Sequence, residues 1–358
     1  MTDRERDRVL HTDSNSVARA RDVFFGRKGL PVEEVNHAIL RSWIRCADMG
    51  LDAGAAPWRD APTASEVRQL HEKYEALSRI CRPELDALYN EAREISGIVV
   101  LTNARGEILD AVGDPSFAGK AAEVALRPGM LWSEDGTGTN AIGTALAERR
   151  AVSVNGAEHY FQVHGGLSCA ATPVIDPRGA IIGVLDISTP VTVQAGAALG
   201  LIRMAVEQIE HRLFRGGFEG CRTVRFQTDA NLLGAAREGI LAVRDGFIVA
   251  ANRRGLSLIG QSWEAIDTMR IDEVFDLTGG ELAAGPARGR DGRDFHLRVD
   301  DDGRARPQAL AQSPSLGDVE LSAIRQALEL HKGNVSAAAR QLGIHRSTIY
   351  RRMAELQG

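Results

Sequence analysis

The chain has 358 residues, a length that predicts two or three domains. Its 44% hydrophobic and 25% charged residues are typical of globular proteins, and a net charge of −5 argues against a polybasic coat for nucleic acid or membrane. No apolar run reaches the roughly 18 residues of a transmembrane helix. The charged segment 1–8 is followed by no apolar stretch, so no signal peptide is predicted. These features predict a cytoplasmic protein without a membrane partner.

Charge is distributed unevenly along the chain. Residues 330–358 carry a net charge of +4, whereas the rest of the chain carries −9. A basic tip on an acidic body indicates that an anionic partner binds at the C-terminal end. The four cysteines are far apart and form no C-x-x-C pair, so neither a zinc knuckle nor a dithiol redox motif is predicted.

The N-terminal third is predicted to be helical. Residues 1–30 are charged and at most locally helical, and apolar residues then recur at helical spacing. Because proline favours the first turn of a helix, Pro83 is expected to begin a new one. Helices are predicted over 31–51, 65–80 and from Pro83 to Glu94.

Strand patterns follow the helices. Short apolar, β-branched runs separated by turn residues predict two hairpins, at 97–112 and 169–187, with a further strand at 151–154. A loop that contains a helix is expected over 114–148. Strand pairs flanked by helices predict an α+β domain with an antiparallel sheet.

The predicted helix over 193–213 has apolar residues spaced 3, 4, 3 and 4 apart, which is a short heptad seam. Two alternatives remain open at this point: the helix packs on its own domain, or it pairs with a second copy of the chain. The seam residues are Leu199, Ile202, Val206, Ile209 and Leu213.

Residues 222–302 form a second, smaller predicted α+β unit. A two-residue Asp245–Gly246 turn joins the apolar runs 239–243 and 247–251, which predicts a tight hairpin. A closing strand is expected at 295–299. The segment 303–317, rich in Gly, Ala, Arg and Pro, is predicted to be a linker.

The last 40 residues predict a helix-turn-helix. Helices are expected over 319–331, 335–342 and 346–356, with Gly343 in the tight turn between the last two. An Arg-Ser-Thr at the start of the third helix can reach base edges in the major groove, and the other basic side chains suit phosphates. The predicted DNA-binding residues are Arg340, Arg346, Ser347, Thr348, Tyr350, Arg351 and Arg352.

The sequence GNVSAAARQLGIHRSTIYRRMAEL in this region resembles the Fis-type DNA-binding domain of bacterial enhancer-binding regulators. The resemblance covers 318–356. It implies a homodimer that binds an inverted repeat in double-stranded DNA.

Three earlier segments resemble the GAF sensor region of AcoR- and DhaR-type transcription regulators. They are SWIRCADMGLD, PGMLWSEDGTGTNAIGTAL and LSCAATPVIDPRGAIIGVLDIS. The segment GILAVRDGFIVAANRRGLSLIG resembles a PAS domain. These resemblances imply α+β sensor domains, GAF-like and then PAS-like, and a small organic effector. The predicted domains are an N-terminal helical region (1–60), a GAF-like sensor (61–215), a PAS-like domain (222–302), a linker (303–317) and a Fis-type helix-turn-helix (318–358).

The chain departs from this family between sensor and DNA-binding domain, where full members carry an AAA+ ATPase. No G-x-x-x-x-G-K-[ST] motif occurs, since Gly119–Lys120 is followed by Ala121, and the sigma-54-contacting loop GAFTGA is missing. Action through binding alone is therefore expected: repression, recruitment of RNA polymerase holoenzyme, or modulation of a full-length paralogue. The alternative is an adaptor for a sigma-54 activator whose terminal domain mainly dimerises.

Candidate effector contacts lie in the GAF-like segment. Neither a catalytic set nor a cofactor is predicted, because Glu158 and Asp135 have no nucleophile between them. The run from Gly136 to Ala141 fits a dinucleotide fingerprint only formally, without a βαβ unit around it. His159, His164 and Cys169 could suggest a metal, but hydrogen-bonded residues of the core or pocket are favoured. The predicted ligand-binding residues are Trp132, Glu134, Thr139, Asn140, His159, Phe161, His164 and Cys169, and for the aromatic ones pocket wall and core remain open alternatives.

Overall fold

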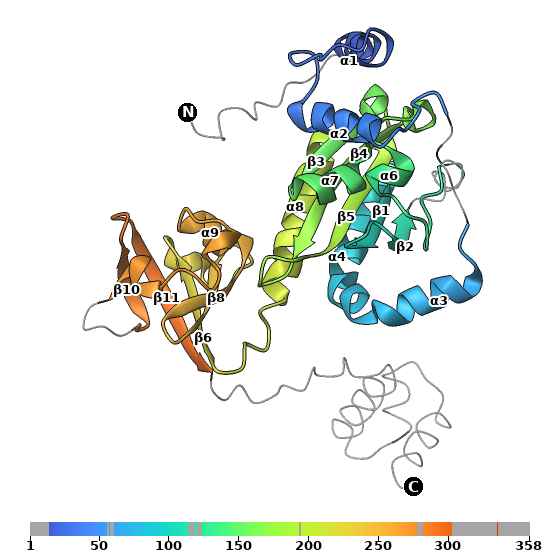
Figure 1. Ribbon diagram of the computed structural model, residues 1–358. Helices are drawn as coiled ribbons and strands as arrows, with labels where there is room; N and C mark the ends of the chain where they lie inside the picture. The colour runs from blue at the N-terminus through green and yellow to red at the C-terminus, as the bar shows by residue number, and fades with distance from the viewer. Residues whose placement is uncertain are drawn as a thin grey trace. The chain divides into compact units, whose positions relative to one another are not determined.

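The computed structural model shows two antiparallel sheets, each with helices beside it (Figure 1). This arrangement confirms the α+β class predicted for the region before the linker. The described residues are 14–302 without 56, 58–60, 114–118, 120–123, 193–194 and 278–281, together with Val335.

The N-terminal region holds α1 (Ser14–Arg21), a π-helical turn η2 (Asp22–Gly26) and α2 (His37–Asp48). Helix α2 begins six residues later than the predicted start at 31, because Asn36 is extended and caps the helix. Its side chain accepts a hydrogen bond from the Ala38 amide at 2.8 Å.

Two consecutive helices follow, α3 (Ala64–Lys73) and α4 (Glu75–Glu94). The prediction of a new helix at Pro83 is wrong, since α4 continues through this residue. The buried residues Cys81, Leu85 and Leu88 hold the helix on the sheet, and tertiary packing overrides the helix-breaking tendency of proline. Arg212 donates to the Ile80 carbonyl at 2.5 Å and so satisfies a backbone acceptor next to the proline.

The first sheet has five strands in the order β2-β1-β5-β4-β3. All of the pairs are antiparallel, and the hairpins predicted at 97–112 and 169–187 are confirmed as β1–β2 and β4–β5. Strand β5 lies in the centre of the sheet. The strands are β1 (Ile98–Asn103), β2 (Ile108–Gly113), β3 (Val152–Asn155), β4 (Leu167–Ile175) and β5 (Ile181–Pro190).

Both faces of this sheet are covered. Helices α4 and α8 (Ala195–Arg212) pack on one face, where they bury an apolar core. The opposite face is covered by α2, α6 (Glu134–Thr137), α7 (Ala141–Glu148) and the short turns η3 (Gly156–Glu158) and η4 (Gln162–His164). Three seam residues of α8, namely Ile202, Val206 and Ile209, are buried against the chain's own sheet, as the intramolecular alternative predicted.

The second sheet has six strands in the order β8-β7-β6-β11-β10-β9. The predicted hairpin is confirmed as β7–β8, and the predicted closing strand as β11. The rings of Phe226, Phe275 and Phe295 meet edge to face in its core, at centroid distances of 5.3–5.7 Å. The strands are β6 (Cys221–Gln227), β7 (Gly239–Arg244), β8 (Phe247–Ala251), β9 (Phe275–Asp276), β10 (Gly285–Gly289) and β11 (Asp294–Asp302), with α9 (Arg253–Leu258) beside them.

Two buried carboxylates connect the end of α8 with the second sheet. Glu210 accepts from Arg253 of α9 at 2.6 Å and from the Ile175 amide of β4 at 3.1 Å. Glu238 accepts from His211 of α8 at 2.9 Å and from Arg225 of β6 at 2.5 Å. Because each carboxylate has a cationic partner on another element, these contacts join the two sheets electrostatically.

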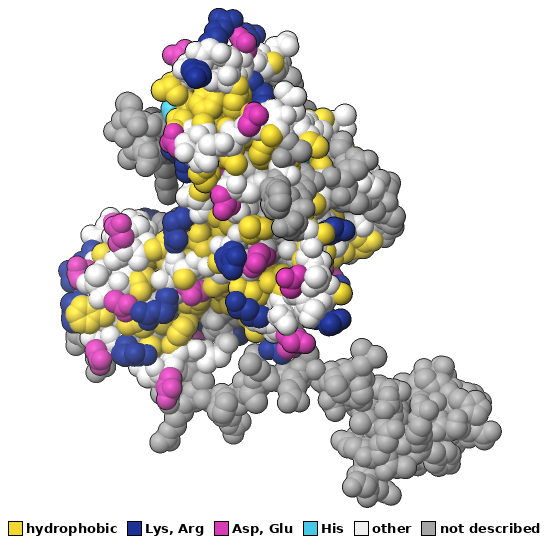
Figure 2. Space-filling model, turned by 45° about the vertical axis from the view of Figure 1, so that its right-hand side comes forward, with side chains coloured by type: hydrophobic (Ala, Val, Ile, Leu, Met, Phe, Trp, Pro, Cys, Tyr) yellow, Lys and Arg dark blue, Asp and Glu magenta, His cyan; other side chains and the backbone are white. Residues whose placement is uncertain are grey.

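Positive and negative side chains alternate over the face of the described residues in Figure 2, which shows no continuous basic surface there. Among the described residues, no helix is both long and apolar enough to cross a membrane.

Replacing Phe275 by Ala should destabilise the second sheet by about 3–5 kcal/mol, because it opens a cavity inside the aromatic trio. Amide hydrogen exchange of β6 and β11 in the full chain measures this loss. Phe247→Ala is the matched control, since that ring is 37% exposed and its removal should change the exchange little. Equal effects of the two substitutions would contradict the packing described here.

Candidate functional site

The predicted ligand-binding residues gather on the face of the first sheet that α2, α6 and α7 cover. The structure brings all of them together there and buries them. They are Trp132, Glu134, Thr139, Asn140, His159, Phe161, His164 and Cys169.

Two of these residues form a hydrogen-bonded clasp with α2. The Glu134 carboxylate accepts from Arg45 twice, at 2.7 and 2.8 Å, and from the Ser42 hydroxyl at 2.6 Å. Ser42 Oγ also lies 2.7 Å from Thr139 Oγ1. Such a bidentate, charge-assisted contact is strong and directional. In this structure Glu134 and Thr139 therefore fasten α2 over the sheet.

Asn140 caps the start of α7, where its side chain accepts from the Gly143 amide at 2.8 Å. The preceding Gly138 has φ +63°, and a Cβ at this position would lie 2.5 Å from Tyr160 Cβ. The run from Gly136 to Ala141 thus connects the end of α6 with the start of α7, and no dinucleotide-binding βαβ unit surrounds it among the described residues.

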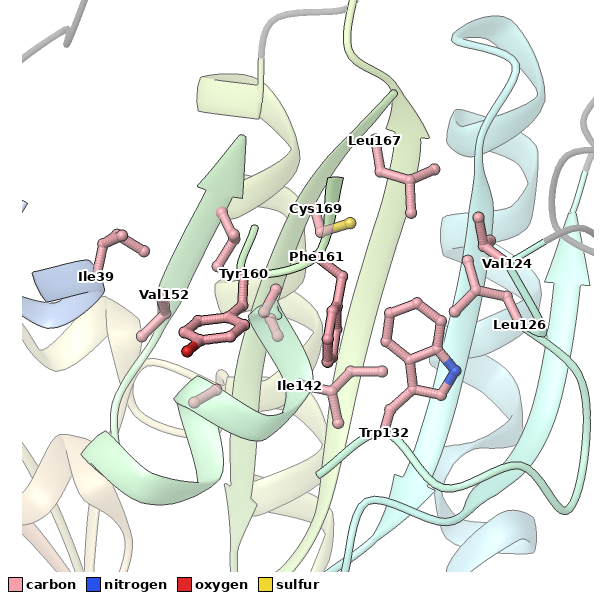
Figure 3. Packing of buried hydrophobic residues seen from close by; sticks show 14 of the residues in the cluster. Ile39, Val124, Leu126, Trp132, Ile142, Val152, Tyr160, Phe161, Leu167 and Cys169 are labelled. Atoms are coloured by element: carbon pink, nitrogen blue, oxygen red, sulfur yellow. The ribbon is translucent and has the colours of Figure 1, made fainter. Parts of the chain in front are cut away.

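Four predicted residues form a ring cluster beside the sheet. The His164 ring lies 5.0 Å from Trp132, 6.1 Å from His159 and 6.3 Å from Phe161 between centroids. In Figure 3, Phe161 lies beside Cys169 of β4, with Ile142 and Trp132 next to it. The cluster gives this side of the sheet an aromatic wall, which suits both a packed core and a small-molecule pocket.

His159 has two different ring nitrogens. Its Nδ1 lies 3.0 Å from the Gly156 carbonyl oxygen and therefore carries the proton, so Nε2 is a bare acceptor. Nε2 is buried and has no hydrogen-bond partner. Burial lowers the pKa of His159 to about 4, which keeps the ring neutral. The described residues contain no group of three or more potential metal ligands.

The central strand adds two polar residues that the sequence analysis missed, Asp186 and Ser188. Ser188 Oγ lies 2.7 Å from Asp186 Oδ2 and 3.2 Å from Cys169 Sγ. Asp186 is 1% exposed, and its Oδ1 has no hydrogen-bond partner within the part of the chain that the structure describes. Burial raises the pKa of Asp186 to about 7 and that of the Cys169 thiol well above its usual value. The available signal was one acidic residue inside the apolar strand VLDIS.

The N-terminal segment is tied to the chain next to His159. The Arg21 guanidinium donates to the carbonyl oxygens of Ala157, His159 and Tyr160 at 3.0, 2.6 and 3.1 Å. A separate open cleft of about 900 Å³ lies between residues 21–30 and 44–54, with Tyr160 and Gln162 in its lining. None of the eight predicted ligand residues lines this cleft.

The seven predicted DNA-binding residues, from Arg340 to Arg352, lie outside the described residues. Their role therefore stays a prediction from the sequence.

Comparison with known families identifies two regions of the chain. Residues 12–211, more than half of the chain, match the family described as MimR, N-terminal domain. The chain belongs to this family. Residues 315–356 match a second family, described as bacterial regulatory protein, Fis family. The MimR N-terminal domain thus contains the first sheet and the buried polar residues of this site, and the Fis-family match lies after the second sheet in the sequence.

Curated relatives of this MimR-type chain are transcription regulators. The propane 2-monooxygenase operon transcriptional activator MimR of Mycolicibacterium smegmatis is 31% identical, over 75% of this chain and 45% of its own length. The acetoin catabolism regulatory protein of Cupriavidus necator is 29% identical, over 66% of this chain and 38% of its own length. The chain spans less than half the length of these relatives.

Two further matches extend the comparison. The glycerol metabolism operon regulatory protein of Citrobacter freundii is 22% identical, over 68% of this chain and 38% of its own length. Among solved structures, the E. coli DhaR(N)–DhaL complex aligns with a TM-score of 0.46 at 16% identity, over 74% of this chain and 99% of the matched chain.

The raised pKa of Asp186 makes stability depend on pH. Between its ordinary pKa of 3.8 and about 7, the folded chain holds a proton that the unfolded chain has released. Stability therefore falls as pH rises through this window, by at most on the order of 4 kcal/mol. The Asp186→Asn variant lacks this titrating group. The difference between its melting temperature and that of the wild type should therefore increase, in favour of the variant, from pH 5 to pH 8.

The contributions of other titrating groups to the pH dependence of stability cancel when the variant is compared with the wild type. Burial raises the pKa of Glu158 to about 7 and lowers that of His159, but both chains carry these residues. A difference in melting temperature that does not change with pH would contradict the assignment to Asp186.

Proposed function

We propose that this chain is a DNA-binding transcription regulator whose MimR N-terminal domain senses a small organic molecule. The observation that carries the proposal is the Fis-family match at 315–356 in the same chain as the MimR N-terminal domain at 12–211. In this proposal the third helix of the helix-turn-helix enters the major groove. Arg346, Ser347 and Thr348 contact bases there, while Arg351 and Arg352 contact phosphates.

Effector sensing is assigned to the covered face of the first sheet. Support comes from buried polar atoms of Asp186 and His159 that have no hydrogen-bond partner among the described residues. A folded protein retains few such atoms, and each one calls for an explanation such as a bound ligand. The names of the relatives refer to acetoin, propane and glycerol metabolism, so a small uncharged effector is consistent with them.

The signal must reach DNA through a change in conformation or association. The ligand shifts the equilibrium only by its difference in affinity between two states, typically 1–3 kcal/mol. Helix α8 and the Glu210 and Glu238 contacts offer a route to the second, PAS-like sheet. A homodimer would place two helix-turn-helix domains on an inverted repeat, which raises affinity over a single small domain.

Action through binding alone is part of the proposal. Only residues 303–317 separate the second sheet from the predicted helix-turn-helix, and no phosphate-binding loop occurs in the 358 residues. The chain would then repress, recruit RNA polymerase holoenzyme, or modulate a full-length paralogue.

Replacing Arg346 and Arg351 by Ala should weaken DNA binding about 100-fold or more, because base and phosphate contacts are lost together. The measurement is a salt titration of binding to a duplex that the wild-type chain selects from a random-sequence library. Wild-type affinity should fall steeply with salt, and the double variant should show a shallower slope.

Arg325→Ala with Lys332→Ala is the matched control, since it removes the same charge outside the predicted third helix. Sedimentation of all three chains reports whether the dimer persists. If the wild type selects no duplex, or if the Arg346 and Arg351 variant binds normally, the regulator proposal fails and the adaptor alternative gains support.

A further inference from the structure

The centre of the first sheet carries an acidic side chain that forms no ion pair with any of the described residues. Asp186 lies on β5 between Val100 of β1 and Ala171 of β4, in register with both. It shares its face of the sheet with Cys169 and Ser188, on the side of α2, α6 and α7. Ser188 donates to Oδ2 at 2.7 Å, whereas Oδ1 has no hydrogen-bond partner among the described residues.

The unpaired Oδ1 of Asp186 lowers the stability of the folded chain when no ligand is bound. A buried polar atom without a hydrogen bond destabilises the fold, and a carboxyl group is more costly than an amide or hydroxyl. The carboxylates of Glu210 and Glu238 show how the same chain stabilises buried acids, because each accepts from an arginine. Among the described residues Asp186 has no such partner, although its side chain is buried in the central strand of the sheet.

A second polar atom on this side of the sheet is also unsatisfied. His159 Nε2 is buried and can only accept, since Nδ1–H is directed to the Gly156 carbonyl. His159 belongs to the ring cluster, and the neighbouring wall contains Phe161 and Trp132. Several side chains of the same core are small, namely Ala141 and Ala145 of α7 and Ala171 of β4.

The polar atoms define the ligand by complementarity. A bare imidazole nitrogen requires a donor such as O–H, and a carboxyl group can accept from a hydroxyl or, when protonated, donate to one. An anionic ligand would find two guanidinium groups already engaged, because Arg45 is bound by Glu134 and Arg21 donates to backbone carbonyls beside His159. Apolar rings around these groups favour a molecule with a hydrocarbon part.

We infer that Asp186, positioned by Ser188, and His159 are the polar anchors of the effector site, and that the effector is a small uncharged molecule with a hydroxyl group. This inference rests on the proposed sensing function and adds two central-strand residues absent from the sequence-predicted set.

The first test requires no knowledge of the ligand. Asp186→Leu combined with Ser188→Ala replaces both hydrogen-bonding partners by apolar groups, so the melting temperature of the ligand-free chain should stay equal or rise. Thr172→Val is the matched control, because Thr172 Oγ1 is also buried without a partner but lies on β4 facing the opposite core. A fall of more than about 5 °C in the Asp186 variant alone would show a structural role and overturn the inference.

The second test uses matched pairs of probes on the full-length chain. Acetoin and butane-2,3-dione differ in one hydroxyl, as do propan-2-ol and acetone. A hydroxyl-bearing member should raise the melting temperature and bind at least 10-fold more tightly than its ketone partner. Asp186→Asn and His159→Phe should each weaken that binding at least 10-fold, whereas Thr172→Val should not change it.

Three results overturn the inference: equal binding of hydroxyl and ketone members, tighter binding of acetate or isopropylamine, or no binding of either hydroxyl probe. Binding to the selected DNA duplex is measured for every variant in parallel. If the wild-type chain binds DNA but no hydroxyl probe, the anchor assignment fails while the regulator proposal stands. If it binds no DNA, the regulator proposal itself fails.

Discussion

The first sheet must be covered on both faces, and the rest of the MimR N-terminal domain depends on how this is achieved. On one face, α4 and α8 bury an apolar core against the strands. On the other, α2 from the start of the chain meets α6 and α7 from its middle, and the Arg45–Glu134 ion pair with Ser42 joins them. These contacts are directional, so they fix α2 relative to α6 and α7. The three helices thereby cover the face of the sheet on which Asp186 lies.

Buried carboxyl groups serve two different purposes in this molecule. Glu210 and Glu238 each have a cationic partner and connect α8 with the second sheet. Burial raises the pKa of Glu210 although Arg253 opposes this, whereas hydrogen bonds from His211, Gly234 and Arg225 lower that of Glu238 despite burial. Asp186 has only a serine, and this difference in partners is what separates a connecting residue from a candidate binding residue.

Local patterns predicted most of the fold. Alternating apolar residues and turn residues located the hairpins β1–β2, β4–β5 and β7–β8, because a tight turn constrains both of its strands. Prediction failed at Pro83, where packing of Cys81 and Leu85 holds a helix together. The local patterns also predicted no strand at β10, because its sequence Gly-Pro-Ala-Arg-Gly is typical of a loop. This segment is a strand because it pairs with β9 and β11 on either side.

The sequence by itself determined the α+β class, the basic C-terminal tip and the helix-turn-helix motif, since these depend on residue order and spacing alone. It also located eight residues that the fold buries on one side of the first sheet. Only the tertiary structure decided which of their polar atoms are satisfied. Glu134 is paired by α2, and Asn140 caps a helix, while Asp186 and His159 retain atoms without a partner. The physical reason is that hydrogen-bond partners come from distant segments, whose approach no local pattern encodes.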